Sequence, residues 1–383
     1  MASLRSNWHT ALFALGIVAF GGWFFLAPPF LFATVYENVV HADYAVPKPV
    51  LNTRDYNFRM LALSHINVAS TTFGLSAAQR AVLASTTATS SPKLLEATTT
   101  ATTSVRVVGK SWPAPAAYPK VGALLPFNRI VAYYGNFYST KMGVLGEYPP
   151  EQMIAMLAST TAAWTAADPS TPAIPAIDYI AVTAQGSAGF DGKYRARMPG
   201  SEIQKAIDLA DQIDGIVVLD VQVGLSTLQE ELPLLEPYLK LPNVHLAIDP
   251  EFSMKGGTPP GRVIGTMDAS DVNYAAHYLA SIVQANHLPP KILVVHRFTT
   301  PMVTNVEKIT PLPDVQIVMD MDGFGTQHLK RGTYQHVITR EPVQFAGMKL
   351  FYKNDIPPRG DALFTPSQVL SSFTPTPVFI QYQ

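Results

Sequence analysis

The sequence contains no cysteine among its 383 residues. This absence excludes disulfide bonds, thiolate metal sites, a cysteine nucleophile and lipid attachment through a lipobox cysteine. Charge is also scarce, since 14% of the residues are charged, against about 25% in an average protein. The formal net charge is −1, so no electrostatic footprint favours nucleic acid as a partner.

The first 42 residues contain a long uncharged stretch. One cation, Arg5, precedes a run from Ala11 to Val35 of about 25 residues, enough to cross the roughly 30 Å core of a bilayer. It is either an uncleaved signal anchor or a long signal peptide cut after Ala42, with a buried core helix as the weaker alternative. We favour a membrane anchor over residues 1–42, because the apolar core of a signal peptide normally has only about 7–15 residues. The rest of the chain is then expected in the cell envelope, outside the cytoplasmic membrane.

Two further segments precede the globular part. Within residues 43–83, the stretch "DYNFRMLALSHINVAS" (55–70) has the apolar spacing of one short amphipathic helix. Residues 84–122 are rich in Thr, Ala, Ser and Pro without an apolar period, which is typical of an extended linker or stalk. A globular domain is therefore predicted over residues 123–383.

That domain alternates short β-branched or aromatic runs with helical stretches. The eight runs are "RIVAYYG" (129–135), "IDYIAVTAQG" (177–186), "GIVVLDVQVG" (215–224), "VHLAIDPE" (244–251), "KILVVHRF" (291–298), "VQIVMDMDGFG" (315–325), "GMKLFYK" (347–353) and "TPVFIQYQ" (376–383). Strands that alternate with helices indicate a parallel sheet with crossover connections.

Eight such units over about 255 residues match a closed (β/α)8 TIM barrel in number and size. The alternative is an open doubly wound sheet, which normally has about five or six strands and often a Gly-rich first turn. The turn "YYGNFYSTKMG" lacks that glycine pattern, so the barrel is favoured. Helix starts are predicted at Ser201 as an N-cap and at the capping-box pattern Ser226-x-x-Gln229. Because no helix follows the eighth strand, we expect the segment near 55–70 to cover the outer wall there.

In a TIM barrel the active site lies at the carboxyl ends of the strands. Polar residues gather at those ends in this sequence, whereas the opposite ends are mostly apolar. They are Tyr134, Asn136, Gln185, Asp220, Gln222, Asp249, Glu251, His296, Arg297, Asp320, Asp322, Lys349 and Gln381, with Tyr352 beside them. This asymmetry predicts a binding or catalytic pocket.

Side-chain alternation places the acids on the inner face of the strands. In "VHLAIDPE", His245, Ala247, Asp249 and Glu251 share the face toward the barrel axis. By the same parity Asp320 and Asp322 share one face, as do Asp220 and Gln222. Five carboxylates at one mouth repel each other, so some must be protonated, paired with Arg297 or Lys349, or bridged by a cation.

Glycoside hydrolysis is one chemistry that uses such a cluster, with Glu251 as general acid and Asp249 as its partner. The pair resembles the end of the D-x-D-x-E motif on the fourth strand of chitinase-like glycosidases, in which the last Glu protonates the leaving oxygen. The resemblance is partial, because Ala247 stands where that motif has its first Asp. Aromatic residues beside the strand ends suit stacking on sugar rings.

Two other chemistries stay open. A divalent metal could be held by Asp249 or Glu251 together with His296 and Asp320, although no H-x-H or H-x-x-x-H pair is present. Lys349 could form a Schiff base, but an ion pair with a neighbouring Asp is the commoner fate of such a lysine. No cofactor is otherwise indicated.

Residues 128–383 also resemble a group of functionally uncharacterised bacterial envelope barrel proteins. The shared stretches are "AYYG", "GVLGEYPPEQM", "LDVQVGLST", "HLAIDPEF", "VHRFT", "DMDGFG" and the terminal "IQYQ". The resemblance implies a secreted or anchored barrel and brings no established reaction. Some relatives are lipoproteins; without cysteine, this chain would be anchored by its apolar segment.

The sequence therefore predicts an extracytoplasmic, membrane-anchored TIM barrel that hydrolyses carbohydrate. Glu251, Asp249, Asp320, Asp322 and Asp220 are the predicted catalytic group. The predicted partners are a cell-wall or other glycan and the membrane. The alternative is a non-catalytic barrel that binds glycan in the same pocket.

Overall fold

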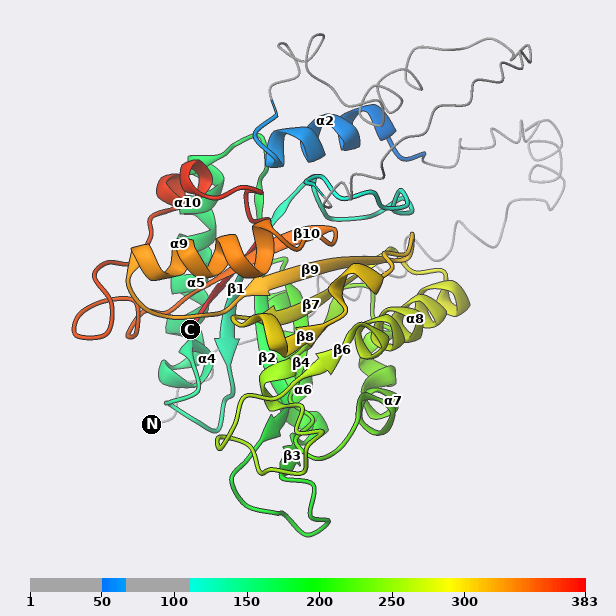
Figure 1. Cartoon of the computed structure of the whole chain (residues 1–383), viewed down its shortest axis with the longest axis vertical. Coiled ribbons are helices and arrows are strands. Elements are labelled where there is room, and N and C mark those ends of the chain that lie inside the picture. The colour runs from blue at the N-terminus through cyan, green and yellow to red at the C-terminus, as the bar shows by residue number, and fades with distance from the viewer. Residues whose placement is uncertain (1–49, 67–110) are drawn as a thin grey trace, which may run out of the picture. The chain divides into compact units, whose positions relative to one another are not determined.

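The computed structural model describes residues 50–66 and 111–383 (Figure 1). The predicted anchor at residues 1–42 and most of the predicted linker lie outside these ranges. Within them, no helix is both long enough and apolar enough to cross a lipid bilayer.

Eight parallel strands form a closed barrel. Strand β1 pairs with both β2 and β11, so the first and last strands close the ring. The others follow in chain order around it. The strands are β1 (Arg129–Gly135), β2 (Ala173–Ala184), β4 (Ile216–Val221), β5 (Val244–Ile248), β7 (Lys291–Arg297), β9 (Val315–Met321), β10 (Phe345–Leu350) and β11 (Phe379–Tyr382). The predicted (β/α)8 barrel is confirmed, and the open sheet is excluded.

Helices connect most of the strands, as Figure 1 shows. They are α4 (Val144–Glu147) and α5 (Pro150–Ala167), α6 (Gly200–Asp211), α7 (Leu228–Leu239), α8 (Ala269–Asn286), α9 (Gln327–Tyr334) with a π-helical extension (Gln335–Thr339), and α10 (Pro366–Ser372). Between β7 and β9 the connection has no α-helix. It consists of two 3-10 turns, Thr300–Met302 and Val306–Lys308, around β8 (Val303–Thr304), which pairs with β6 (Met267–Asp268).

Two predicted helix starts are shifted by one or two residues. The N-cap of α6 is Pro199, so Ser201 lies inside the helix. The N-cap of α7 is Thr227, whose side chain accepts a hydrogen bond from the backbone of Glu230. The hydroxyl of Ser226 donates instead to the carboxylates of Glu230 and Glu231. The side-chain cap therefore lies one residue later than predicted, and Ser226 contacts acids four and five residues further along the chain.

The alternation of side chains separates two apolar layers. Outward residues such as Val244, Leu246 and Ile248 of β5 pack with the surrounding helices. Inward residues form a second cluster in the lower part of the barrel, including Ile130, Ala132, Ala176, Val218, Ala247, Val294, Val318 and Phe379. Because a β-strand turns successive side chains to opposite faces, one sequence pattern fills both layers.

Helix α2 (Thr53–Leu63) lies at the amino-terminal end of the barrel. Tyr56 and Met60 are buried in the inner cluster, and the Tyr56 ring lies 6.2 Å from that of Phe127, just before β1. The backbone of Thr376, just before β11, donates to the carbonyl of Leu63. The expected position of this segment against the outer wall is corrected accordingly.

The outer wall beside β11 is filled by α5 and α10. Trp164 of α5 is fully buried and its indole N–H donates to the Tyr382 hydroxyl at 3.0 Å. Helices α5 and α10 also contact each other. The place that a further helix would take is therefore covered by two neighbours, which leaves α2 free to close the barrel end.

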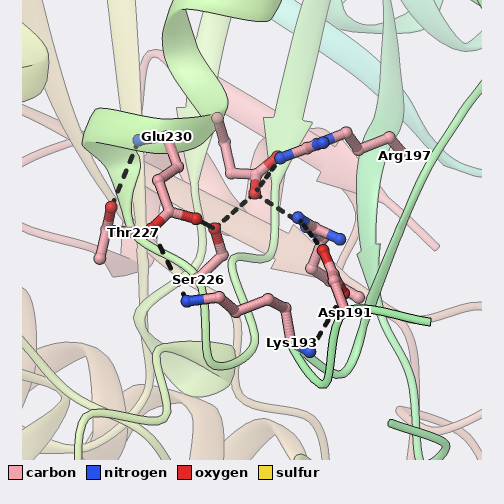
Figure 2. Close-up of polar contacts among 8 residues, drawn as sticks. Asp191, Lys193, Arg197, Ser226, Thr227 and Glu230 are labelled. Atoms are coloured by element: carbon pink, nitrogen blue, oxygen red, sulfur yellow. Dashed lines mark hydrogen bonds and ion pairs between the residues drawn. The ribbon is translucent and has the colours of Figure 1, made fainter. Parts of the chain in front are cut away.

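A buried carboxylate fixes the long loop after β2. Glu231 on α7 is fully buried and accepts hydrogen bonds from Arg195 at 2.8 Å and from Arg197 at 2.7 Å, both on β3 (Arg195–Arg197), as well as from Ser226 (Figure 2). Burial alone would raise the pKa of Glu231, but these hydrogen bonds and the Arg195 charge lower it overall. The Glu231 carboxylate therefore stays ionised and ties the β2–β3 segment to the start of α7.

Replacing Glu231 with alanine should leave the buried Arg195 guanidinium without its main partner. Loss of one member of a buried ion pair typically costs about 3–5 kcal/mol of unfolding free energy. Urea denaturation of Glu231→Ala should show a loss of that size. The neighbouring Glu230→Ala is the matched control, because its 3.6 Å ion pair with Lys193 is exposed and worth about 1 kcal/mol or less. Equal losses in the two variants would contradict the assignment.

Candidate active site at the mouth of the barrel

A cavity of about 610 Å³ opens at the carboxyl ends of the strands. Its polar wall consists of Tyr134, Gln222, Asp249, Glu251, Asp322 and Lys349, with Lys141 and Asn354 at the loops. Its apolar wall includes four phenylalanines, Phe252, Phe298, Phe324 and Phe351. The cavity has the size and the mixed apolar and polar lining that are typical of small-molecule sites.

Below the cavity, a polar layer separates it from the apolar interior of the barrel. Seven of the eight strands contribute one buried residue to this layer or directly above it, and the eighth residue, Asp249, directly follows β5. The residues are Tyr134, Asp178, Asp220, Asp249, His296, Asp320, Lys349 and Gln381. Gly347 on β10 makes room for the Asp320 side chain, because a Cβ atom at residue 347 would lie 2.4 Å from Asp320 Oδ1. The layer therefore depends on a residue without a side chain.

Asp249 and Glu251 occupy different environments although they are two residues apart. Asp249 is buried, and its Oδ1 accepts the backbone N–H of Glu251 at 3.0 Å, which starts the 3-10 turn Pro250–Phe252. Burial and the charges of Asp220, Asp322 and Glu251 raise its pKa well above the usual value. Glu251 is only partly buried and lines the cavity.

Asp322, rather than Asp249, provides the charge that raises the pKa of Glu251. Burial is the main cause of that shift and the Asp322 carboxylate is the next, against smaller opposing effects of Lys349 and His296. A carboxyl group with a raised pKa in a cavity has the protonation state that a general acid needs.

His296 lies at the centre of the polar layer. Its Nε2 is 3.0 Å from Asp220 Oδ2, and its Nδ1 is 3.4 Å from Asp320 Oδ2 and 3.7 Å from Asp322 Oδ2. Burial alone would lower the pKa of His296, but these three carboxylates raise it well above the usual value. The ring is therefore an imidazolium that neutralises part of the acidic cluster.

Asp178 is a member of this layer that the sequence analysis missed. It is fully buried on β2, and its Oδ2 accepts a hydrogen bond from the Gln381 amide at 2.5 Å. Burial and the Asp220 charge raise its pKa to about 8. The signal was available, because Asp178 shares its strand face with the inward Ala176, but it lies inside an apolar run rather than at its end.

Tyr134, Gln222 and Lys349 connect the layer to the cavity. The Gln222 amide donates to the Tyr134 hydroxyl at 3.1 Å and lies 3.5 Å from Asp249 Oδ2. The Lys349 ammonium sits 3.5 Å above the centre of the Tyr134 ring. In the part of the chain that the structure describes, no carboxylate oxygen lies within 4.0 Å of this ammonium, so Lys349 does not form the expected ion pair.

Two predicted site residues point away from the cavity. Arg297 is on the outer face of β7, where its guanidinium pairs with Glu341 and donates to the carbonyls of Thr299, Thr300, Val303 and Val337. Tyr352 stacks on Tyr382, at 5.2 Å between ring centres, and its hydroxyl meets that of Tyr133 at 3.1 Å. Both expectations are corrected, because strand parity turns these side chains toward the helices.

Two others lie near the mouth without lining the cavity. Asn136 is buried, and its side chain donates to the Ile180 carbonyl and accepts from the Tyr138 backbone. Gln185 is partly exposed at the start of the loop after β2. Asn136 therefore orders the first loop rather than offering a free ligand-binding group, which corrects its predicted role.

Metal binding was the alternative for Asp249, Glu251, His296 and Asp320. Across residues 50–66 and 111–383, no three His, Asp or Glu side chains are arranged so that they could hold a metal ion. Both ring nitrogens of His296 face carboxylates, as described above. The acids that surround His296 thus act as its ion-pair partners in this structure.

Comparison with known proteins adds only a coarse likeness. No protein family and no curated protein matches the chain by sequence. Among solved structures, "Cellulase Cel5C_n" aligns with a TM-score of 0.33 and 13% identity over 63% of this chain and 68% of its own. The clostridial cellulose synthase subunit Z from Clostridioides difficile aligns with a TM-score of 0.25 and 11% identity, over 51% and 62% of the two chains. With TM-scores this low, no argument about function rests on either likeness.

The raised pKa values predict how stability depends on pH. For Asp178, the pKa rises from 3.8 to about 8 in the folded protein, so folding takes up a proton between these two pH values and the stability present at low pH is lost progressively across that interval. His296, whose pKa is also raised, acts in the same direction. Unfolding free energy should therefore fall between about pH 4 and about pH 8.

Asp178→Asn tests this assignment, because asparagine can still accept the Gln381 hydrogen bond but does not titrate. The pH slope of its unfolding free energy, measured by urea denaturation, should be shallower than that of the wild type over the same range. Parallel slopes in the two proteins would show that Asp178 does not carry the proton.

Proposed function

We propose that this barrel is a hydrolase of carbohydrate with Glu251 as the general acid. The observation that carries the proposal is the position of Glu251, a partly exposed carboxyl group on the cavity wall whose pKa is raised by burial and by Asp322. Its proton can reach a ligand in the cavity, whereas the acids of the polar layer are buried beneath it.

The shape and lining of the cavity support a sugar ligand. Its volume of about 610 Å³ lies within the roughly 300–1,000 Å³ of typical small-ligand sites. The rings of Phe252, Phe298, Phe324 and Phe351 offer flat apolar faces, on which the C–H faces of sugar rings stack. Gln222 and Asn354 offer amide groups beside those rings for hydroxyl groups.

Each acid has a distinct role in the proposed reaction. Glu251 protonates the glycosidic oxygen as the bond to the sugar breaks. Asp322, on the same cavity wall, is the second carboxylate that stabilises the positive charge developing on the sugar. Asp249 holds the backbone of Glu251 through its 3.0 Å hydrogen bond, and Asp220 and Asp320 hold His296 in place.

We also propose that the barrel works outside the cytoplasmic membrane. The support is the uncharged run from Ala11 to Val35, which is long enough for an anchor. Fractionation of cells that express the full chain, followed by protease treatment of intact spheroplasts, would test this location. A barrel protected from the protease would contradict it.

The hydrolase proposal predicts that Glu251 matters most when the leaving group is poor. Glu251→Gln should lower turnover of oligosaccharides by about 100- to 10,000-fold, whereas dinitrophenyl glycosides, whose leaving group needs no proton, should be much less affected. Wild-type activity should fall as pH rises through the raised pKa of Glu251. The measurement is steady-state kinetics on gluco-, galacto- and N-acetylglucosamine-based substrates.

Glu151→Gln is the matched control, because Glu151 is exposed on α5 and lines no part of the cavity. If Glu251→Gln slowed both substrate classes equally, Glu251 would not be the acid. If the wild type bound oligosaccharides but turned none over, the non-catalytic glycan-binding alternative would replace the hydrolase.

A further inference from the structure

The cavity and the layer beneath it carry more acids than bases. The acids of the cavity wall are Asp249, Glu251 and Asp322, against the cations Lys141 and Lys349. Beneath them lie Asp178, Asp220 and Asp320 against His296. The formal excess of negative charge faces a space large enough for an organic ligand.

Asp322 is an acid of the cavity wall that has an unfilled hydrogen-bonding position. It is only 8% exposed, and its Oδ1 has no hydrogen-bond partner. Its Oδ2 is 3.7 Å from His296 Nδ1, which is beyond hydrogen-bond distance. A buried carboxylate oxygen without a donor is unfavourable. Although this oxygen is itself buried, the Asp322 side chain lines the cavity, so a donor on a ligand can approach the carboxylate from there.

The cationic side chains near Asp322 have other interaction partners. Lys330 on α9 pairs with Asp355 at 3.0 Å and donates to the carbonyls of Gly323 and Lys349. Lys349 sits over the Tyr134 ring, as described above. His296 lies nearest to Asp220. Within the described ranges, no ammonium or guanidinium group lies within 4.0 Å of the Asp322 carboxylate, and its ion-pair partner is the His296 ring at 3.7 Å, which it shares with Asp220 and Asp320.

From this arrangement we infer that the ligand itself brings a positive charge, and that the preferred substrate is a glycan with free amino groups, such as a de-N-acetylated glucosamine oligomer. This inference rests on the proposed carbohydrate function. The ammonium group of the ligand would donate to Asp322, with Glu251 beside it, while the phenylalanine faces contact the sugar rings. Aromatic rings also attract cations, as the Lys349–Tyr134 contact shows inside the same cavity.

Proton release is a consequence that distinguishes an ammonium from a neutral ligand. The groups that face Asp322 are Asp220, Asp249, Glu251, His296, Asp320 and Lys349 on the strands, with Tyr134 and Lys330 nearby. Burial and the charges of Asp320 and Asp220 raise the pKa of Asp322, which favours its protonated form when no cation is bound. A bound cation favours the ionised acids, so binding should release protons and affinity should increase with pH until the ligand amine loses its own proton.

Titration calorimetry with three oligomers of equal length tests the inference. Glucosamine oligomers should bind at least about 10-fold more tightly than N-acetylglucosamine or glucose oligomers, the size expected of one charge-assisted hydrogen bond. Their binding enthalpy should change with the ionisation enthalpy of the buffer, which reports proton release, whereas that of the neutral oligomers should not.

Asp322→Asn should weaken binding of the glucosamine oligomer by about 10- to 100-fold and should reduce its advantage over the neutral oligomers by a similar factor. Glu151→Gln should leave all three unchanged. Equal affinity of the wild type for the three oligomers, no binding of the glucosamine oligomer, or displacement of it by magnesium or calcium ions at low concentration would each overturn the inference. The wild-type comparison stands even if Asp322→Asn fails to fold.

Failure of this inference and failure of the proposed hydrolase are distinguishable. Turnover of neutral oligosaccharides without preference for amino sugars would remove the inference and keep the hydrolase. Tight, proton-releasing binding of glucosamine oligomers without turnover would keep the inference and remove the hydrolase.

Discussion

The contact between His296 and three carboxylates from two other strands holds the centre of this barrel together. Asp220, Asp320 and Asp322 lie within 3.0–3.7 Å of its two ring nitrogens. Without that imidazolium, the closed ring would bring several acids into one dry space with Lys349 as the main remaining compensating charge. Burial and the neighbouring acids raise the pKa values of Asp249, Asp322 and Glu251, and the charge of His296 limits each of these shifts.

The barrel could be predicted from the sequence because the alternation of strands and helices is regular. Parity along "VHLAIDPE" also placed Asp249 on the inner face, since a strand fixes which way each side chain points. Arg297 and Tyr352 were assigned to the mouth because they follow strand ends, although the same parity, applied to them, turns both outward. Position along the strand does not show whether a residue reaches the cavity, because the direction of its side chain determines that.

Other features depend on contacts between distant residues, which one sequence does not show. Ser226 is not the N-cap of α7, because its hydroxyl donates to Glu231. The Glu231 carboxylate is held in turn by the two arginines of β3. Helices α5 and α10 contact each other and fill the outer wall beside β11, so α2 packs at the amino-terminal end of the barrel instead. Asp178 could not be predicted because it lies inside an apolar run. Its hydrogen-bond donor, Gln381, is 203 residues away along the chain.

Helix α2 closes the amino-terminal end of the barrel, and this affects how water and protons can reach its interior. Below the polar layer the barrel interior is filled by apolar side chains such as Ala132, Val218 and Val294, and Tyr56 and Met60 cover its base. In the part of the chain that the structure describes, these apolar side chains separate the acids of the interior from the solvent at the amino-terminal end, so we expect them to exchange protons with water through the open mouth. A ligand that fills the mouth should therefore slow that exchange while it stays bound.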